Sequence, residues 1–188
     1  MSGPVAPAAA PLSLAPGESI ALTGDAMAYR VEEGLVEVYA AGLDAGEPAS
    51  HRRFLFAMKA GDLAPPAGSA SESGFGFLLI AARDAALTPV SAQACLQADP
   101  AAFASALDRW ILAMSGALSP LLGPYPEGAT LETAASAVTL ERGAAFALRG
   151  GVGWCVAREA ILEDALGAAI PRTGADQIMP LAPGLWAR

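Results

Sequence analysis

The side chains best suited to chemistry gather in one short stretch, SHRRF, which holds His51, Arg52 and Arg53. His51 is the only histidine of the chain. A metal centre in a small β-roll needs several imidazoles and a carboxylate on one ion, so a lone histidine does not supply one. We predict that His51 is a solvated turn residue and that the chain holds neither a metal nor another cofactor.

Arg52 and Arg53 allow two interpretations, because they stand at the entrance of a predicted strand. They could pair with Glu32 and Glu33 across the sheet, an exposed interaction that is worth little by itself. They could instead form a docking spot for an acidic partner segment, since complementary charge favours specific association. The sequence leaves both interpretations open.

The parts that common enzyme mechanisms need are missing. Cys95 and Cys155 lie far apart without metal-ligand spacing, and Cys155 with a distant His51 does not make a thiol-protease pair. The sequence contains neither a Gly-x-x-x-x-Gly-Lys-Ser/Thr phosphate loop nor a Gly-x-Ser-x-Gly nucleophile elbow. We therefore predict a protein that is not an enzyme, without catalytic residues and with reduced cysteines.

The sequence also lacks the arginine expected to bind the phosphate of a cyclic nucleotide. A cyclic phosphate in a buried pocket needs an arginine and backbone donors aimed at its oxygens, with a carboxylate for the ribose. Between Phe54 and Asp108 the only basic residues are Lys59 and Arg83, and we expect Arg83 to be a solvated charge at a strand end. Residues 64–74 are predicted to be a flexible loop in the place of the phosphate cassette.

Short alternating strands are predicted to position these residues. In LVEVY, Val36 and Val38 should point inward and Glu37 and Tyr39 outward. Large side chains at Phe54, Phe56 and Met58 are expected to share one face of a strand. The period predicts a mainly β fold with one prominent helix, a cupin-like or cyclic-nucleotide-binding-like β-roll (jelly roll), followed by a second, partial β module.

The sequence DPAAFASALDRWILAMSGAL has helical periodicity instead. Asp99 is a natural N-cap and Pro100 suits the first helical position. An apolar stripe falls at helical spacing and is formed by Phe103, Leu107, Trp110, Ile111, Met114 and Leu118. This stripe could pack on the chain's own β-roll or on a second chain, so a homodimer is also allowed.

Two segments of the chain resemble each other: LAPGESIALTGDAMAYRV at residues 14–31 and LERGAAFALRGGVGWCV at residues 140–156. Such a recurrence indicates tandem β modules. We predict a disordered tail at residues 1–13 and a first β-roll at 14–95. A helix and linker at 96–122 and a second, incomplete β module at 123–188 are expected to follow.

Charge and composition exclude several partners. The chain has 188 residues, a formal net charge of −8 and a pI near 4.5, which argues against phosphate-backbone partners such as nucleic acid. No run of about 18 strongly apolar residues exists, so membrane insertion is not expected. The opening residues lack a basic region and are rich in proline, and we predict a cytoplasmic location.

Several quoted segments, read together, are similar to a known family. LTGDAMAYRVEEGLVEVYAAGLDAGEPASHRRFLFAMKAGDLAPP and GFLLIAARDAAL resemble the N-terminal region of the ATP-binding and permease subunits of NHLM/NHLP bacteriocin-system ABC transporters. DRWILAMSGAL resembles that family's tryptophan-containing helix, and GVGWCVAREAIL with IMPLAPGLWAR resembles its second β module. One departure is Asp62, which stands where the family usually has Glu after the glycine.

The resemblance implies a bacterial, cyclic-nucleotide-binding-like double β-roll at the inner face of the plasma membrane. Its partners would be the transmembrane and ATPase parts of an exporter, or the precursor peptide. Our main hypothesis is a non-catalytic regulatory or interaction module for peptide export, with a docking surface at Arg52, Arg53 and Trp110. The alternative is a degenerate cyclic-nucleotide-like sensor that binds a small ligand.

Overall fold

This computed structural model describes residues 10–24, 26–44, 47–49, 51–67, 75–118, 130–133, 145–156, 162–164, 178–183 and 185–187. The chain divides into two compact units, Met1–Trp110 and Ile111–Arg188. Strand β1 begins at Leu12, before the end of the predicted tail at residue 13. The other predicted domain boundaries, after residues 95 and 122, remain predictions.

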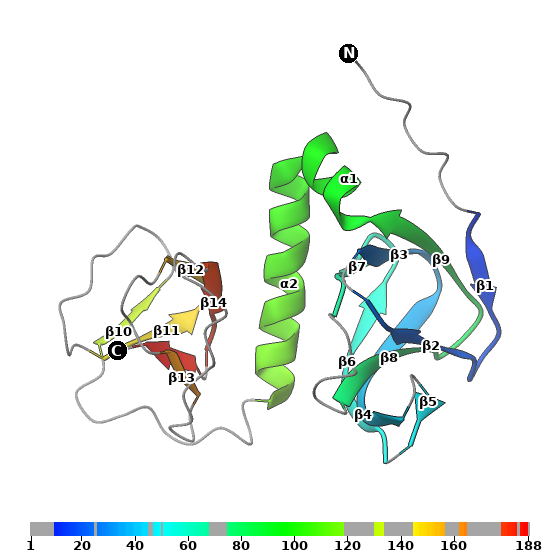
Figure 1. Cartoon of the computed structure of the whole chain (residues 1–188), viewed down its shortest axis with the longest axis horizontal. Helices are drawn as coiled ribbons and strands as arrows, with labels where there is room; N and C mark the ends of the chain where they lie inside the picture. Colours follow the sequence, from blue (N-terminus) through cyan, green and yellow to red (C-terminus); the bar gives the residue numbers. More distant parts are fainter. Residues whose placement is uncertain are drawn as a thin grey trace. The chain divides into compact units, whose positions relative to one another are not determined.

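The first unit contains strands β1 to β9 and helix α1, and the long helix α2 begins in it (Figure 1). Its strands are β1 (Leu12–Leu14), β2 (Ser19–Leu22), β3 (Met27–Glu33), β4 (Leu35–Asp44), β5 (Glu47–Pro48), β6 (Arg53–Lys59), β7 (Leu63–Ala64), β8 (Phe75–Ala81) and β9 (Ala85–Ser91). The helices are α1 (Ala92–Ala98) and α2 (Pro100–Leu118).

The strand pairing of the first unit is that of one long antiparallel hairpin folded over on itself. Counted outward from its tip, β4 pairs with β6, β3 with β7, β2 with β8, and β1 with β9. Wrapping adds the pairs β4–β8 and β3–β9. The result is a four-stranded sheet, β1-β9-β3-β7, and a five-stranded sheet in which β2-β8-β4 is extended by β5 and β6, both paired with β4. This nesting defines a jelly roll, so the predicted β-roll fold is confirmed.

The core of the roll follows from the alternation of the strands. Val36 and Val38 are fully buried, as predicted, while Glu37 and Tyr39 lie on the opposite face of β4. Val31 and Leu87 pair with each other and are also fully buried, on the other sheet. Each sheet thus directs one apolar row into the roll, and this burial is the main favourable contribution to its stability.

Strand β6 departs from the alternation that the sequence predicted. Val38 pairs with Phe56, but the next residue, Tyr39, pairs with Phe54, so Leu55 is the extra residue of a β-bulge. Leu55 is buried and Phe54 is 50% exposed. The prediction that Phe54 shares a face with Phe56 and Met58 is therefore wrong, because the bulge reverses the pleat between them.

Two helices follow β9, where the sequence predicted one. Ser91 caps α1 through its hydroxyl, which accepts a hydrogen bond from the Ala94 N–H at 3.3 Å. Asp99 caps α2, because its Oδ1 accepts from the Ala102 N–H at 2.9 Å, and Pro100 occupies the first helical position as predicted. α1 buries none of its residues, so no apolar stripe marked it in the sequence.

Helix α2 packs on the chain's own roll, which answers a question that the sequence left open. Ala106 of the helix forms a buried cluster with Ala28 of β3 and Leu63 of β7. Phe103 and Val90 pack against this cluster. The first half of the predicted stripe is therefore used within the first unit.

The second unit contains strands β10 (Thr130–Thr133), β11 (Phe146–Gly150), β12 (Gly153–Val156), β13 (Leu162–Asp164), β14 (Ile178–Leu181) and β15 (Leu185–Ala187). Its buried cluster is formed by Phe146, Leu148 and Leu181, with Cys155 packed against it. The Ser115 hydroxyl donates a hydrogen bond to the Pro183 carbonyl, which ties the end of α2 to this unit.

Pairing in the second unit repeats part of the first. β11 pairs with β15, β13 with β15, and β12 with β14, all antiparallel. In the first unit β2 pairs with β8, β4 with β8, and β3 with β7, in the same chain order. The short sequence Leu-Ala-Pro begins at Leu63 in β7 and again at Leu181 in β14, two strands that correspond in this pairing order. These correspondences agree with the recurrence seen in the sequence.

The part of the chain that the structure describes contains no helix with the length and apolarity needed to span a membrane.

Candidate functional site

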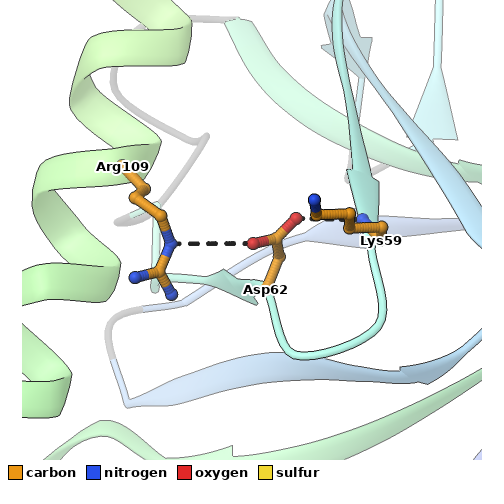
Figure 2. Close-up of polar contacts among 3 residues, drawn as sticks. All are labelled: Lys59, Asp62 and Arg109. Carbon is orange, nitrogen blue, oxygen red and sulfur yellow. Dashed lines mark hydrogen bonds and ion pairs between the residues drawn. The ribbon is translucent and has the colours of Figure 1, made fainter.

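The corner between β6 and β7 is a tight turn organised by Asp62 (Figure 2). Its Oδ2 accepts the Lys59 N–H at 2.9 Å, and its own N–H donates to the Lys59 carbonyl at 3.0 Å. Gly61 has φ +89°, a left-handed conformation that glycine adopts without strain. The sequence KAGDL at residues 59–63 is typical of a turn, and the structure shows that the carboxylate closes it.

The same carboxylate reaches helix α2. Asp62 Oδ1 lies 3.7 Å from Nε of Arg109, as Figure 2 shows. The Arg109 side chain is 57% exposed and that of Asp62 27% exposed, so water weakens this ion pair. Asp62 thus has a structural role, because it holds the turn and contacts the helix.

Next to this corner, Trp110 of helix α2 packs on the side of the roll that faces the helix. Its ring packs edge-on against Phe56 of β6, with centroids 5.0 Å apart, and against Phe77 of β8, at 6.1 Å. Phe56 pairs with Val38 and Phe77 with Ala40, so both rings lie on the core-facing side of their sheet. Aromatic side chains therefore occupy the space between helix and roll.

The described residues around the β6–β7 corner offer few basic side chains for the phosphate of a cyclic nucleotide. Lys59 and Arg83 are both exposed, Arg83 in the turn between β8 and β9 as expected. Ala64 is fully buried, and the predicted loop from that residue lies outside the described residues at 68–74. The described part of this corner thus offers a phosphate no buried arginine.

The three residues predicted to form a docking surface lie in different surroundings. Arg52 and Arg53 are exposed at the start of β6, whereas Trp110 is half-buried against Phe56 and Phe77. Arg53 pairs with Ala40 of β4, and neither arginine pairs with Glu32 or Glu33 among the described residues. Their role as a docking surface stays a prediction.

In the structure, a pair of packed aromatic residues, Tyr39 and Phe54, accompanies Arg52 and Arg53. Phe54 follows Arg53, and its ring packs edge-on against Tyr39 with centroids 5.6 Å apart. The Tyr39 hydroxyl donates to Glu37 Oε2 at 2.8 Å. This hydrogen bond raises the pKa of Tyr39, as do burial and the Glu37 charge, while the Arg52 charge lowers it. The sequence signalled neither the exposure of Phe54 nor this pairing.

Metal and thiol chemistry find little support in the described ranges. No group of three or more His, Cys, Asp or Glu side chains there could hold a metal ion. Cys95 and Cys155 are free thiols, and Arg30 Nη2 lies 4.0 Å from Cys95 Sγ. Burial raises the pKa of the Cys155 thiol, which lowers the fraction of the reactive thiolate.

Comparison with protein-family models gave no match, and neither did comparison with curated proteins. Among solved structures, the reduced Fe(II) CO-sensing protein from R. rubrum is similar with 19% identity and a TM-score of 0.43, over 59% of this chain and 49% of that chain. The chain thus spans about half the length of that protein.

The heme domain of CooA from Carboxydothermus hydrogenoformans is similar with 14% identity and a TM-score of 0.44, over 60% of this chain and 76% of that chain. Oxidized CprK in complex with o-chlorophenolacetic acid has 12% identity and a TM-score of 0.42, over 60% of this chain and 46% of that chain. The fold assignment accordingly rests on the strand pairing described above.

Proposed function

We propose that this chain is a non-catalytic interaction and regulatory module whose β-roll serves as a scaffold. The observation that carries this proposal is the packing of Trp110 against Phe56 and Phe77. A small-molecule site needs a concave pocket with a few convergent polar groups. Here aromatic rings occupy the space between the helix and the roll.

The surroundings of the rings support the same function. Asp62, which closes the β6–β7 turn, uses both carboxylate oxygens within the protein, on Lys59 and Arg109. Function is therefore expected on the outer surface of the roll, where Arg52, Arg53 and Phe54 are exposed.

We further propose that the module belongs to a bacterial peptide exporter of the ABC type. Support comes from the sequence resemblance, above all Val31 to Gly34 and the Arg-Arg-x-Leu-Phe strand that begins at Arg52. In this proposal its partners are the transmembrane and ATPase parts of the exporter or the precursor peptide, at the inner face of the plasma membrane.

Thermal unfolding with cyclic AMP and cyclic GMP tests the absence of a nucleotide site. A ligand that binds only the folded state raises its stability by RT ln(1 + [L]/Kd). We expect no shift of Tm at millimolar nucleotide. A saturable rise in Tm would overturn the scaffold proposal in favour of the alternative, a sensor for a small ligand.

Deletion of residues 10–118 from a complete exporter tests the transport context. We expect export of the modified peptide to fall, while unrelated secretion in the same cells is unchanged. Export and exporter assembly at the level of the intact protein would contradict the proposal.

A further inference from the structure

Strand β6 forms the edge of its sheet. In the described ranges it pairs with β4 alone, and β4 pairs with β8 on its other side. An edge strand presents N–H and C=O groups along its outer side and can accept an added strand from a peptide. The first unit therefore offers a backbone template beside residues 53–58, because the N–H and C=O groups of Lys59 are already bonded to Asp62.

Phe54 gives this edge an apolar contact that is already held in place. The ring is 50% exposed, yet its edge-on packing on Tyr39 restricts it. Tyr39 is fixed in turn by its hydrogen bond to Glu37. A restricted aromatic ring loses little conformational entropy on binding and can bury a large apolar area.

The charge of the edge is opposite to that of the whole protein. Residues 51–59 include Arg52, Arg53 and Lys59 and no Asp or Glu, in a chain of net charge −8. All three basic side chains are exposed. At about 3.3 Å per residue, Arg53 and Lys59 stand roughly 20 Å apart along the strand.

We propose that the β6 edge binds an acidic peptide in extended conformation, as an added strand of the sheet. Carboxylates of the peptide pair with Arg52 and Arg53 at one end and with Lys59 at the other. An apolar side chain between them packs on Phe54. This inference rests on the interaction function proposed above and supplies the chemistry of the partner.

The charge pattern favours an acidic partner over a second copy of the chain. If two β6 strands paired, each basic end would meet the basic residues of the other strand, in either orientation. Like charges placed opposite each other across a strand pair are destabilising. Lysine and other charges on edge strands commonly prevent such self-association.

The test uses the full chain and a fluorescent seven-residue peptide, the length of β6, with Glu at both ends and Leu at the second and sixth positions, so that one Leu lies opposite Phe54 in either strand orientation. A control peptide carries Gln in place of Glu, and a second carries proline at alternating positions, which blocks strand pairing. Fluorescence anisotropy gives the affinity for the chain, for Arg52→Glu/Arg53→Glu and for Phe54→Ser. Arg83→Glu is the matched control, since Arg83 is exposed but outside β6.

We expect the Glu peptide to bind, and both control peptides to bind at least about tenfold more weakly. The double charge reversal and Phe54→Ser should each lower the affinity, and added salt should lower it further. Arg83→Glu should bind like the unaltered chain. Absence of binding, or equal binding by the double-reversal chain, would overturn the inference.

Failure of this inference is distinguishable from failure of the proposed function. If the peptide does not bind while exporter deletion still reduces export, the module function stands and the partner chemistry is wrong. If a nucleotide raises Tm, the scaffold function fails irrespective of the peptide result.

Discussion

Gly34 lies where two turns of the first unit, β3–β4 and β8–β9, come close together. It joins β3 to β4 with φ +89°, and a Cβ built on it would lie 2.7 Å from the Ala85 Cα and in still closer contact with the Asp84 carbonyl. No side chain fits between these turns without a backbone shift. Close approach of the turns, rather than flexibility, requires glycine here.

Gly34→Ala is therefore expected to destabilise the protein strongly. The left-handed conformation costs about 1–2 kcal/mol and overpacking about 1–3 kcal/mol more. Gly61→Ala is the matched control, because Gly61 has the same φ but nothing within 4 Å of its Cβ position. Urea unfolding measures both variants, and equal losses of stability would refute this account.

Cys155 should show a pH dependence of its own. Burial raises the pKa of its thiol above the ordinary value of about 8.5. The folded state keeps the thiol proton to higher pH than the unfolded chain. Its stabilising contribution is thus complete below the unfolded pKa and is lost as the pH rises through the folded pKa.

The measurement is the alkylation rate of Cys155 between pH 7 and pH 11, in a chain that carries Cys95→Ser so that only one thiol reacts. We expect the midpoint of the rate profile above about 8.5, the value for a free thiol. The urea-unfolded chain provides the reference. A folded midpoint at or below the unfolded one would contradict the burial argument.

At the scale of elements, α2 is attached to the roll by apolar and polar contacts of different strength. Trp110 contributes aromatic packing on two strands, whereas Arg109 contributes an exposed ion pair to Asp62. Buried apolar area is worth more than an exposed ion pair, so the tryptophan should dominate.

Trp110→Ala is expected to lower the free energy of unfolding by about 2 kcal/mol, less than the 3–5 kcal/mol of a fully buried aromatic. Trp110→Phe keeps an aromatic ring and should lose less. Denaturant unfolding followed by far-UV circular dichroism gives both values. A negligible loss in the alanine variant would show that the helix does not depend on this contact.

Asp62 should matter more to stability than its ion pair does. Asp62→Ala removes the acceptor of the Lys59 N–H, and we expect a loss of about 1 kcal/mol, the usual worth of such a hydrogen bond. Arg109→Gln removes only the exposed pair and should cost less than about 1 kcal/mol. Asp62→Asn keeps an acceptor and should resemble Arg109→Gln. A larger loss for Arg109→Gln than for Asp62→Ala would reverse this ranking.

At the scale of the whole molecule, net charge governs which polyanions can bind. With a formal charge of −8, the chain is repelled by nucleic acid, whose binding depends on neutralising phosphates. We expect no shift of a labelled DNA duplex at physiological salt, with a basic DNA-binding protein as positive control. Binding that weakens with salt would refute the prediction and would point to the basic β6 edge as its site.

The sequence by itself determined the features that depend on neighbouring residues. Alternation fixed the buried face of β4, and Asp99 followed by Pro100 fixed the start of α2, because a strand period and a cap are local properties. Turn residues likewise located the β6–β7 corner.

Only the tertiary structure decided how these elements meet. The bulge at Leu55 depends on the partner strand, since β6 has one residue more than β4 between the pairs that they share, and it turns Phe54 outward. Asp62 closes its own turn and also contacts Arg109 of α2, and Trp110 packs on β6 and β8. These contacts, and the position of β6 at the edge of its sheet, depend on residues that are far apart in the chain. Long-range pairing and packing leave no period in the sequence, so the exposed aromatic beside the arginines became visible only in the folded molecule.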